Sequence, residues 1–366
     1  MEKKFLPGML ICLSISASFG GCGGNDTHAT KNFVYVTNSS SNNISAYTID
    51  ATTGKLTTIA GSPFATGTRP ESVTVGASGK FVYAANFGSG DISAYTIDAA
   101  TGTLAAVAGS PFAAGIAPVS ITADSSGKFV YVANLGSGGI SAYTIDATTG
   151  ALTAIAGSPF AINMPQSITV DPSGKFVYIP YIASDYISAY NIDATTGALT
   201  AIAGGPFHAG SAPVSVTVDP SGKFAYVANQ FSHNISAYSI NAATGTLAAI
   251  ADSPFAAGAS PVAVAVDPFG RFAYVTNSGG QSVSAYNINT TTGALMAIAG
   301  SPFAAGSIPK SVTVDPTGKF AYVANQVSNN ISAFTIDTTT GALTTVSGSP
   351  FATGLSPSSI VTVKGK

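Results

Sequence analysis

A single repeated unit fills nearly the whole chain, and its period limits the fold more than any other feature. Its most regular marker is a Phe-x-Tyr run that usually ends in Asn. The seven copies are FVYVTN (Phe33–Asn38), FVYAAN (Phe81–Asn86), FVYVAN (Phe129–Asn134), FVYIPY (Phe176–Tyr181), FAYVAN (Phe224–Asn229), FAYVTN (Phe272–Asn277) and FAYVAN (Phe320–Asn325). Successive copies end 48, 48, 47, 48, 48 and 48 residues apart, and a fixed period of this size is typical of solenoids, propellers and arrays.

Each unit contains four short apolar runs. In the unit from Pro213 to Phe255 they read SVTV, KFAYVAN, NISAYSI and TLAAIA, separated by DPSG, QFSH and NAATG. Val, Ile, Tyr, Phe and Thr favour strands, whereas the Pro, Gly, Asn and Asp between the runs favour turns. No run has apolar residues at helical spacing over enough length for a helix. The unit therefore predicts four strands and no helix.

The alternation along each strand indicates how the sheets pack. In FAYVAN, Phe224 and Tyr226 lie on one face and Ala225 and Val227 on the other. Both faces are mostly apolar, so both need to be covered by other sheets. Small sheets covered on both sides and repeated seven times predict an all-β, seven-bladed β-propeller of four-stranded antiparallel blades. A β-helix is the alternative, but its coils are usually much shorter than this period.

The two ends of the repeat region predict how the ring closes. The chain enters at FVYVTN, which is the second run of a unit, and leaves at PSSIVTV, residues 357–363, which matches a first run. The C-terminal strand should therefore complete the blade begun at the N-terminal end and remove the open sheet edge. PSSIVTV can be aligned with PKSVTVD in two registers, and a slip of one residue would exchange the two faces.

The composition fits one closed, well-buried domain. Hydrophobic residues make up 46% of the chain and charged residues only 8%, and the formal net charge is −2. A near-neutral, charge-poor surface argues against binding of nucleic acid and against an electrostatic membrane patch.

Residues 1–21 have the features of an export signal. Lys3 and Lys4 precede a largely apolar stretch from Phe5 to Phe19, and small residues stand before Cys22. The sequence Ser-Phe-Gly-Gly-Cys resembles the cleavage site of a bacterial lipoprotein, although Phe19 stands where such signals usually have Leu. The resemblance implies lipidation of Cys22 and export to the cell envelope, either periplasmic or at the surface. If the protein is simply secreted, Cys22 is removed or left free.

The cysteine count agrees with this division of the chain. Cys12 lies within the signal, Cys22 lies at its end, and no cysteine follows. A disulfide is therefore excluded from the exported domain. The expected organisation is a signal at residues 1–21, a polar tether at 22–31 and the propeller at 32–366.

Seven copies allow the two rims of the ring to be compared within one sequence. The turns between first and second strands (DPSGK and close variants) and between third and fourth strands (DATTG and close variants) barely vary. Asp, Asn and Gly at these places predict turn chemistry. Calcium binding is the alternative, but each loop offers a single carboxylate where tight calcium sites need several oxygens. The turns between second and third strands differ from copy to copy, as do the crossovers to the next unit.

The variable rim is therefore the expected functional face, because binding residues often lie on loops held by a rigid scaffold. Neutral drift of exposed loops is the alternative. The fourth copy departs most, with Pro180-Tyr181 in place of Ala-Asn and a crossover that is one residue shorter. The polar or unusual residues on this rim are the candidate ligand-binding residues: Arg69, Glu71, Asp91, Gln166, Tyr181, Asp185, His208, His233 and Lys310.

These candidates suggest two chemistries. His208 and His233 belong to one unit and could approach Asp185 of the neighbouring one, but the spacing gives no set of three or four metal ligands, so neither a metal nor another cofactor is expected. Glu71 and Asp91 could act as an acid–base pair. A surface salt bridge of Arg69 with either carboxylate is the favoured alternative. No catalytic constellation is evident.

The runs YVTN at residues 35–38 and 274–277, with their variants, resemble the YVTN β-propeller repeat over essentially the whole exported chain. That repeat family is similar to the seven-bladed lactonase propellers, which include 6-phosphogluconolactonases, and also occurs in surface-layer proteins. The resemblance implies a propeller and raises the possibility of a lactonase. The chain has three His residues and only Arg69 and Arg271 as arginines, and no catalytic motif can be matched residue by residue.

The sequence favours an exported, lipid-anchored, monomeric propeller that acts as a binding or surface-interaction module. Its expected partner is a protein or a carbohydrate-like ligand at the variable rim, with the membrane contacted through lipidated Cys22. A lactonase-like hydrolase acting at the same rim is one alternative. An envelope structural protein is the other.

The lipid anchor can be tested by fractionation. The protein made in a Gram-negative bacterium should be recovered with membranes, whereas the Cys22→Ser variant should be recovered in the soluble fraction because it lacks the thiol that accepts the lipid. Membrane recovery of both proteins would contradict lipidation.

Overall fold

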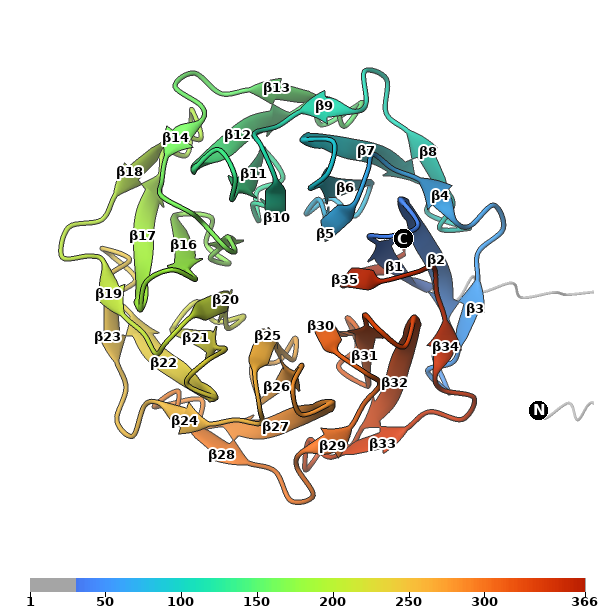
Figure 1. Ribbon diagram of the computed structural model, residues 1–366, viewed down its shortest axis with the longest axis vertical. Coiled ribbons are helices and arrows are strands. Elements are labelled where there is room, and N and C mark those ends of the chain that lie inside the picture. Colours follow the sequence, from blue (N-terminus) through green and yellow to red (C-terminus); the bar gives the residue numbers. More distant parts are fainter. Residues whose placement is uncertain (1–30, 366) are drawn as a thin grey trace, which may run out of the picture.

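A computed structural model describes residues 31–365, which form a closed ring of seven β-sheets (Figure 1). The expected signal and Cys22 lie outside the described residues, as does the tether up to residue 30. The part of the chain that is described contains no helix long and apolar enough to cross a membrane. The seven-bladed all-β architecture that the repeat predicts is confirmed.

Within each blade the strands run from the channel outward. The innermost strands are β5 (Pro70–Val75), β10 (Pro118–Ala123), β15 (Thr169–Val170), β20 (Pro213–Val218), β25 (Pro261–Val266), β30 (Pro309–Val314) and β35 (Pro357–Lys364). The second strands are β1 (Asn32–Asn38), β6 (Phe81–Asn86), β11 (Phe129–Asn134), β16 (Phe176–Tyr181), β21 (Phe224–Asn229), β26 (Phe272–Asn277) and β31 (Phe320–Asn325). The third strands are β2 (Asn43–Ile49), β7 (Asp91–Ile97), β12 (Gly139–Ile145), β17 (Tyr186–Ile192), β22 (Asn234–Ile240), β27 (Ser282–Ile288) and β32 (Asn330–Ile336).

Two shorter strands complete the outer part of each blade. The fourth strands are β3 (Leu56–Thr58), β8 (Leu104–Ala106), β13 (Leu152–Ala154), β18 (Leu199–Ala201), β23 (Leu247–Ala249), β28 (Leu295–Ala297) and β33 (Leu343–Thr345). The fifth are β4 (Phe64–Ala65), β9 (Phe112–Ala113), β14 (Phe160–Ala161), β19 (Phe207–His208), β24 (Phe255–Ala256), β29 (Phe303–Ala304) and β34 (Phe351–Ala352). The sequence predicts four strands per blade. The fifth is a two-residue segment of the crossover that pairs with the start of the third strand.

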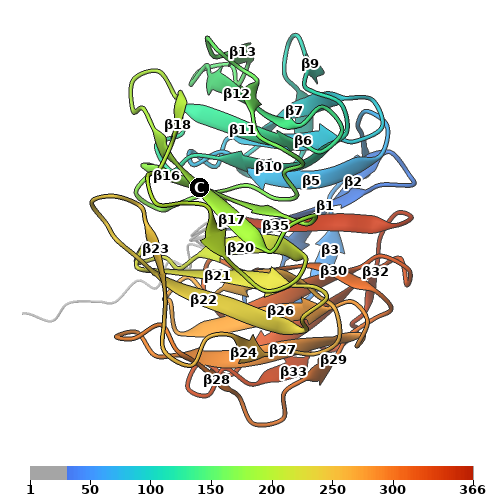
Figure 2. The same ribbon diagram turned by 60° about the vertical axis from the view of Figure 1, so that its left-hand side comes forward.

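The C-terminal strand closes the ring. β35 pairs antiparallel with β1, and Figures 1 and 2 show this red strand beside the blue strands of the first blade. Phe33 faces Val363 and Val36 faces Ile360, so the register places Pro357 where Pro309 stands in the seventh blade. The sequence leaves two registers open, and this pairing selects the one that buries Ile360 and Val363. Blade 1 is therefore assembled from both ends of the chain, and blades 2 to 7 follow in chain order.

The hydrophobic core is a series of layers between neighbouring blades. The second strands are buried along their whole length, except for Tyr181 at the end of β16. In the layer between blades 7 and 1, Tyr322 and Ala324 pack in one cluster with Val34 and Val36. The expectation that both faces of each sheet are covered is confirmed.

A hydrogen bond from a buried tyrosine links every blade to the next. The Tyr hydroxyl of the second strand donates to the carbonyl oxygen of the Gly that ends the third-to-fourth turn of the following blade, at 2.8–3.0 Å. The seven pairs are Tyr35–Gly102, Tyr83–Gly150, Tyr131–Gly197, Tyr178–Gly245, Tyr226–Gly293, Tyr274–Gly341 and Tyr322–Gly54. Burial raises the pKa of these tyrosines well above its ordinary value, which keeps the donor proton in place. The last pair joins blade 7 to blade 1.

The same glycines receive a phenylalanine from the neighbouring blade. Gly54 has φ +73°, and a Cβ added there would overlap the ring of Phe320. Gly102 and Gly293 stand in the same relation to Phe33 and Phe224. Only Gly fits, because the position needs both a positive φ and a close approach of the ring.

Aspartates fix the uniform rim by turn chemistry, as the sequence predicts. In the first-to-second turn of blade 5, Asp219 Oδ1 accepts hydrogen bonds from the backbone N–H groups of Lys223 (2.9 Å) and Phe224 (2.7 Å). In the third-to-fourth turn of blade 1, Asp50 Oδ1 accepts from those of Thr52 (3.0 Å) and Thr53 (2.8 Å).

Five third-to-fourth turns contain such an aspartate. Backbone N–H bonds hold the pKa of four of them below its ordinary value, and the Thr101 hydroxyl is the main cause for the fifth, Asp98. The five are Asp50, Asp98, Asp146, Asp193 and Asp337.

The Gly–Phe contact predicts a large difference between two glycines of blade 1. Gly54→Ala should lower the free energy of unfolding by about 1–2 kcal/mol for the positive φ and by about 1–3 kcal/mol more for the overlap with Phe320. Gly61→Ala is the matched control, since Gly61 has φ +81° but the nearest atom to an added Cβ is 3.6 Å away. Denaturant unfolding measures both variants, and equal losses would contradict the role of the ring contact.

The turn aspartates predict a loss of stability in acid. Their folded pKa lies below the unfolded value of about 3.9, so their contribution is fully present above that pH and is lost as pH falls through the folded pKa. Replacing all five with Asn should flatten the fall of Tm between about pH 5 and pH 2.

The chain supplies the control for this experiment. Asn241 and Asn289 already accept the same turn bonds, from Ala243 (2.9 Å) and Thr291 (3.0 Å). Changing both to Asp should steepen the acid limb of the Tm curve. An acid limb that is the same in all three proteins would contradict this account.

Candidate functional site

Two positions of the repeat line the channel mouth on the variable rim. The first is the residue after the Pro that begins each inner segment, and it contributes Glu71, Val119, Gln166, Val214, Val262, Lys310 and Ser358. The second follows the last residue of the second strand, and it contributes Phe87, Leu135, Ile182, Gln230 and Gln326. Both positions differ from copy to copy, although Ser358 also joins blades 1 and 2 by donating from its hydroxyl to the Pro70 carbonyl oxygen at 2.7 Å.

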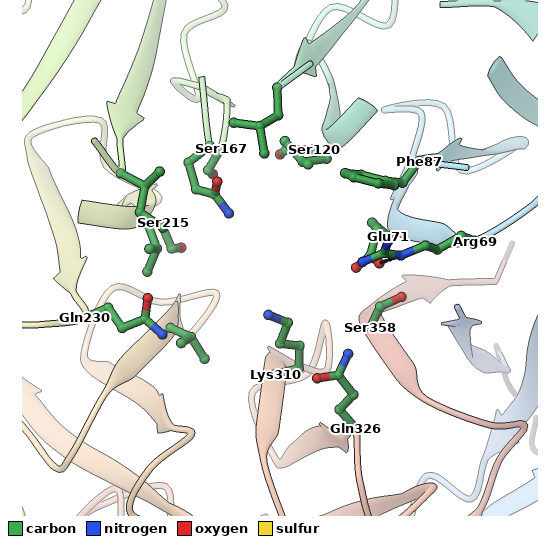
Figure 3. Close-up of a pocket in the computed structure, with 16 residues that line it drawn as sticks. Arg69, Glu71, Phe87, Ser120, Ser167, Ser215, Gln230, Lys310, Gln326 and Ser358 are labelled. Atoms are coloured by element: carbon green, nitrogen blue, oxygen red, sulfur yellow. Dashed lines mark hydrogen bonds and ion pairs between the residues drawn. The ribbon is translucent and has the colours of Figure 1, made fainter. Parts of the chain in front are cut away.

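Together these residues enclose a cavity of about 460 Å³ (Figure 3). Serines one residue deeper, including Ser120, Ser167 and Ser215, line it from below. Some of these serines also join blades, since Ser120 Oγ accepts a hydrogen bond from the backbone N–H of Ile168 at 3.3 Å. The cavity has the size of a small-molecule site.

Arg69 and Glu71 form an ion pair at one side of the mouth. Arg69 Nε lies 3.0 Å from Glu71 Oε1, and the two side chains are 59% and 16% exposed. The Arg69 guanidinium also stacks on the Phe87 ring, with Cζ 4.3 Å from the ring centroid. The backbone is held as well, because the Arg69 N–H donates to Asn42 Oδ1 at 2.8 Å. The salt bridge expected for Arg69 is therefore present, with Glu71 as its partner.

Lys310 enters the cavity from another blade. Figure 3 shows its side chain, with those of Gln230 and Gln326, extending into the space that Arg69 and Glu71 border. Between residues 31 and 365 the salt bridges are Arg69–Glu71 and Arg271–Asp267, so Lys310 makes none there. Its ammonium can therefore bind a ligand oxygen without first leaving an ion pair.

The mouth can thus bind a polar molecule by a carboxylate, two cations and several amides and hydroxyls. No three His, Cys, Asp or Glu side chains among residues 31–365 are grouped so that they could hold a metal ion. The chemistry available to these side chains is hydrogen bonding, charge stabilisation and proton transfer.

The structure places four of the sequence candidates at this mouth: Arg69, Glu71, Gln166 and Lys310. The other five, Asp91, Tyr181, Asp185, His208 and His233, are not among its lining residues. Asp91 accepts a 2.6 Å hydrogen bond from Asn86 Nδ2 within its own blade. Glu71 and Asp91 therefore have separate partners, and no acid–base pair links them.

The two candidate histidines make contacts within the rim and do not line the mouth. His233 Nδ1 accepts the backbone N–H of Ser260 at 2.9 Å, as Asn42 and Asn329 do for the corresponding residues of other blades. His208 packs on the Tyr186 ring with centroids 4.4 Å apart.

The sequence candidates omit several lining residues, notably Phe87, Gln230 and Gln326. Their signal is weak because the first is an ordinary aromatic residue and the other two are uncharged. The signal that could have found them is their position, since the residue after the second strand is Ser, Phe, Leu, Ile or Gln, whereas the residue before it is Asn in six of the seven copies.

Comparisons with known proteins agree with this architecture. Residues 26–167, 109–216 and 166–354 match the family model described as lactonase, 7-bladed beta-propeller. A comparison with curated protein sequences gives no match.

Solved structures show the same fold. A candidate 6-phosphogluconolactonase from Bacteroides fragilis is 24% identical, with a TM-score of 0.78 over 92% of this chain and 99% of that one. The periplasmic gluconolactonase PpgL of Pseudomonas aeruginosa is 20% identical, with a TM-score of 0.77 over 92% of this chain and all of that one. A protein from Lactobacillus plantarum is 22% identical, with a TM-score of 0.76 over the same shares.

Proposed function

The chain belongs to the lactonase family of seven-bladed β-propellers, and we propose from this premise that its channel mouth hydrolyses a sugar lactone. The observation that supports the proposal is the arrangement of one carboxylate, Glu71, and two cationic side chains, Arg69 and Lys310, around one polar cavity. The sequence alone favours a binding module. The family match moves the preference to the hydrolase.

The proposed reaction needs one water molecule and no cofactor. Glu71 orients the water and accepts its proton while the water oxygen bonds to the lactone carbonyl carbon. The ring C–O bond then breaks, and the leaving oxygen takes the proton back. Arg69 and Lys310 stabilise the negative charge that develops on the carbonyl oxygen and then on the product carboxylate.

The charges favour a lactone without a phosphate group. Arg69 is paired with Glu71, which leaves Lys310 as the unpaired cation that lines the mouth within residues 31–365. A phosphate group is usually bound by several cations or backbone N–H groups. An uncharged aldonolactone, held through its hydroxyls by Gln166, Gln230 and Gln326, suits this cavity better. We propose that the enzyme works in the cell envelope, anchored through Cys22.

A binding module remains the second candidate. The carboxylate that lines the mouth, Glu71, is already ion-paired with Arg69 at 3.0 Å, so the guanidinium occupies one of its two oxygens. A protein that binds the lactone or its open acid without turnover would fit that feature.

Turnover by the purified propeller tests the proposal. Hydrolysis of glucono-1,5-lactone, followed by acid release with the spontaneous rate subtracted, should be saturable. Glu71→Gln should lower kcat/KM by roughly 100-fold or more because the proton acceptor is lost. Lys310→Met should lower it by roughly 100-fold because a charge-stabilising group is lost.

Lys319→Met is the matched control, since it removes an exposed lysine from the uniform rim and should leave turnover unchanged. Equal rates in the wild type and the Glu71→Gln variant would contradict the role of the mouth. Saturable binding without turnover in the wild type would favour the binding module.

A further inference from the structure

A second cavity lies where blade 4 meets the crossover that follows blade 3. Its volume is about 350 Å³, and it shares no lining residue with the channel mouth. Its walls are residues 161–164 of the crossover, residues 181, 183, 184, 186, 188 and 190 of blade 4, and Pro206. We call it the blade-4 crevice.

Blade 4 lacks a network that the other blades have, and this loss enlarges the crevice. In blade 5, for example, Asn229 Nδ2 donates to Asn234 Oδ1 and to Ser236 Oγ, both at 2.8 Å. The crossover Gly210 passes so close that a Cβ there would lie 2.8 Å from the Asn229 amide. In blade 4, Tyr181 replaces that Asn, and the one-residue deletion in the crossover removes that Gly.

Two further changes in blade 4 adjoin the same place. A Ser of the crossover accepts a 2.9 Å backbone hydrogen bond in the six other blades, and Gly205 stands there in blade 4. Tyr186 begins β17 where the other blades have Asn, Asp, Gly or Ser, and it is held by the ring of His208. Four departures from the repeat therefore meet at one crevice.

A matched crevice shows what these changes do. The equivalent space at blade 7, lined by Gly306, Asn330, Ser332 and Phe334 among others, has a volume of about 180 Å³. The blade-4 crevice is about twice as large, and Tyr190 stands in it where blade 7 has Phe334.

The Tyr190 hydroxyl lacks the partner of its counterparts. Tyr47, Tyr143 and Tyr286 each donate to a carbonyl of the preceding blade at 2.6 Å, whereas no such bond joins Tyr190 to Ala161 among the described residues. Tyr190 is also half-buried where those three are buried. Its hydroxyl therefore stands at the cavity, beside that of Tyr181.

The lining selects a class of ligand. Three Tyr rings and Pro206 offer flat apolar surfaces, and the side chains of Asn163, Ser184, Ser188 and Tyr190 offer hydrogen bonds. No lining residue is charged, which disfavours an anion or a cation. A neutral pyranose ring has C–H faces that can stack on aromatic rings and an edge of hydroxyls, and so it matches both features.

We infer that the blade-4 crevice is a second binding site, for a neutral sugar ring. Binding to residues 22–366 can be measured by saturation-transfer NMR and calorimetry with the methyl pyranosides of glucose, galactose and mannose. At least one should bind saturably, whereas gluconate should not compete with it.

Three variants locate the binding. Tyr190→Phe should weaken it by about 3- to 10-fold, the effect of one lost hydrogen bond, and the fold should tolerate Phe because Phe334 occupies this position in blade 7. Ala183→Phe should abolish binding, because it fills the crevice from an exposed position. Tyr143→Phe is the control in blade 3, where the hydroxyl already has a protein partner, and should leave binding unchanged.

Three results would overturn the inference. One is that none of the three glycosides binds. Another is that binding is unaffected by Ala183→Phe, which would place the sugar elsewhere. The last is that p-cresol binds at the crevice while the sugars do not, which would make the site one for aromatic compounds.

Discussion

The fold depends on the contact in which each blade inserts a Phe and a Tyr into the third-to-fourth turn of the next. The Tyr hydroxyl donates to the Gly carbonyl, and the Phe ring occupies the space that a Cβ would need, as Tyr322, Phe320 and Gly54 show at the closing junction. The chain has no cysteine after Cys22, so this set of contacts and the β1–β35 pairing hold the ring without a disulfide. Since each blade contacts mainly its two neighbours, closure gives every blade the same environment.

This contact also explains why one rim is uniform and the other is not. The third-to-fourth turn receives the Phe and Tyr side chains of the neighbouring blade. The first-to-second turn positions that Phe, for example through the hydrogen bond that the Phe224 N–H donates to Asp219 Oδ1. A substitution in either turn therefore disturbs an interface between blades. The turns of the opposite rim do not receive these side chains. The residues after each Pro and after each second strand can therefore change while the ring stays closed. Function on this scaffold is thus decided by a small number of side chains at the mouth and not by the fold.

The architecture could be predicted from the sequence because the same strand pattern occurs seven times. The number of blades, the covered faces and the closing strand follow from FVYVTN, its copies and PSSIVTV. The fifth strand could not be predicted, because two residues such as Phe64 and Ala65 have no periodicity. At the mouth, Arg69, Glu71, Gln166 and Lys310 were found as departures from the repeat, whereas Gln230 and Gln326 are neither charged nor rare. A residue that departs from the repeat does not always belong to the site. His233 departs from it, yet its Nδ1 accepts the same backbone hydrogen bond that Asn42 accepts in blade 1.

Blade 4 shows how such a ring can acquire a new feature locally. It has lost the Asn–Ser network and the close-packed Gly of its crossover, yet Tyr131 still bonds Gly197 at 2.9 Å and Tyr178 still bonds Gly245 at 3.0 Å. Its Tyr–Gly junctions with both neighbours are therefore intact, although its innermost strand β15 has only two residues and the Tyr190 bond to blade 3 is missing among the described residues. A blade whose interfaces are fixed elsewhere can exchange internal hydrogen bonds for a cavity, because the neighbouring blades keep its second strand in place. Four departures that meet at one crevice form the pattern that we expect of a binding site and not of drift.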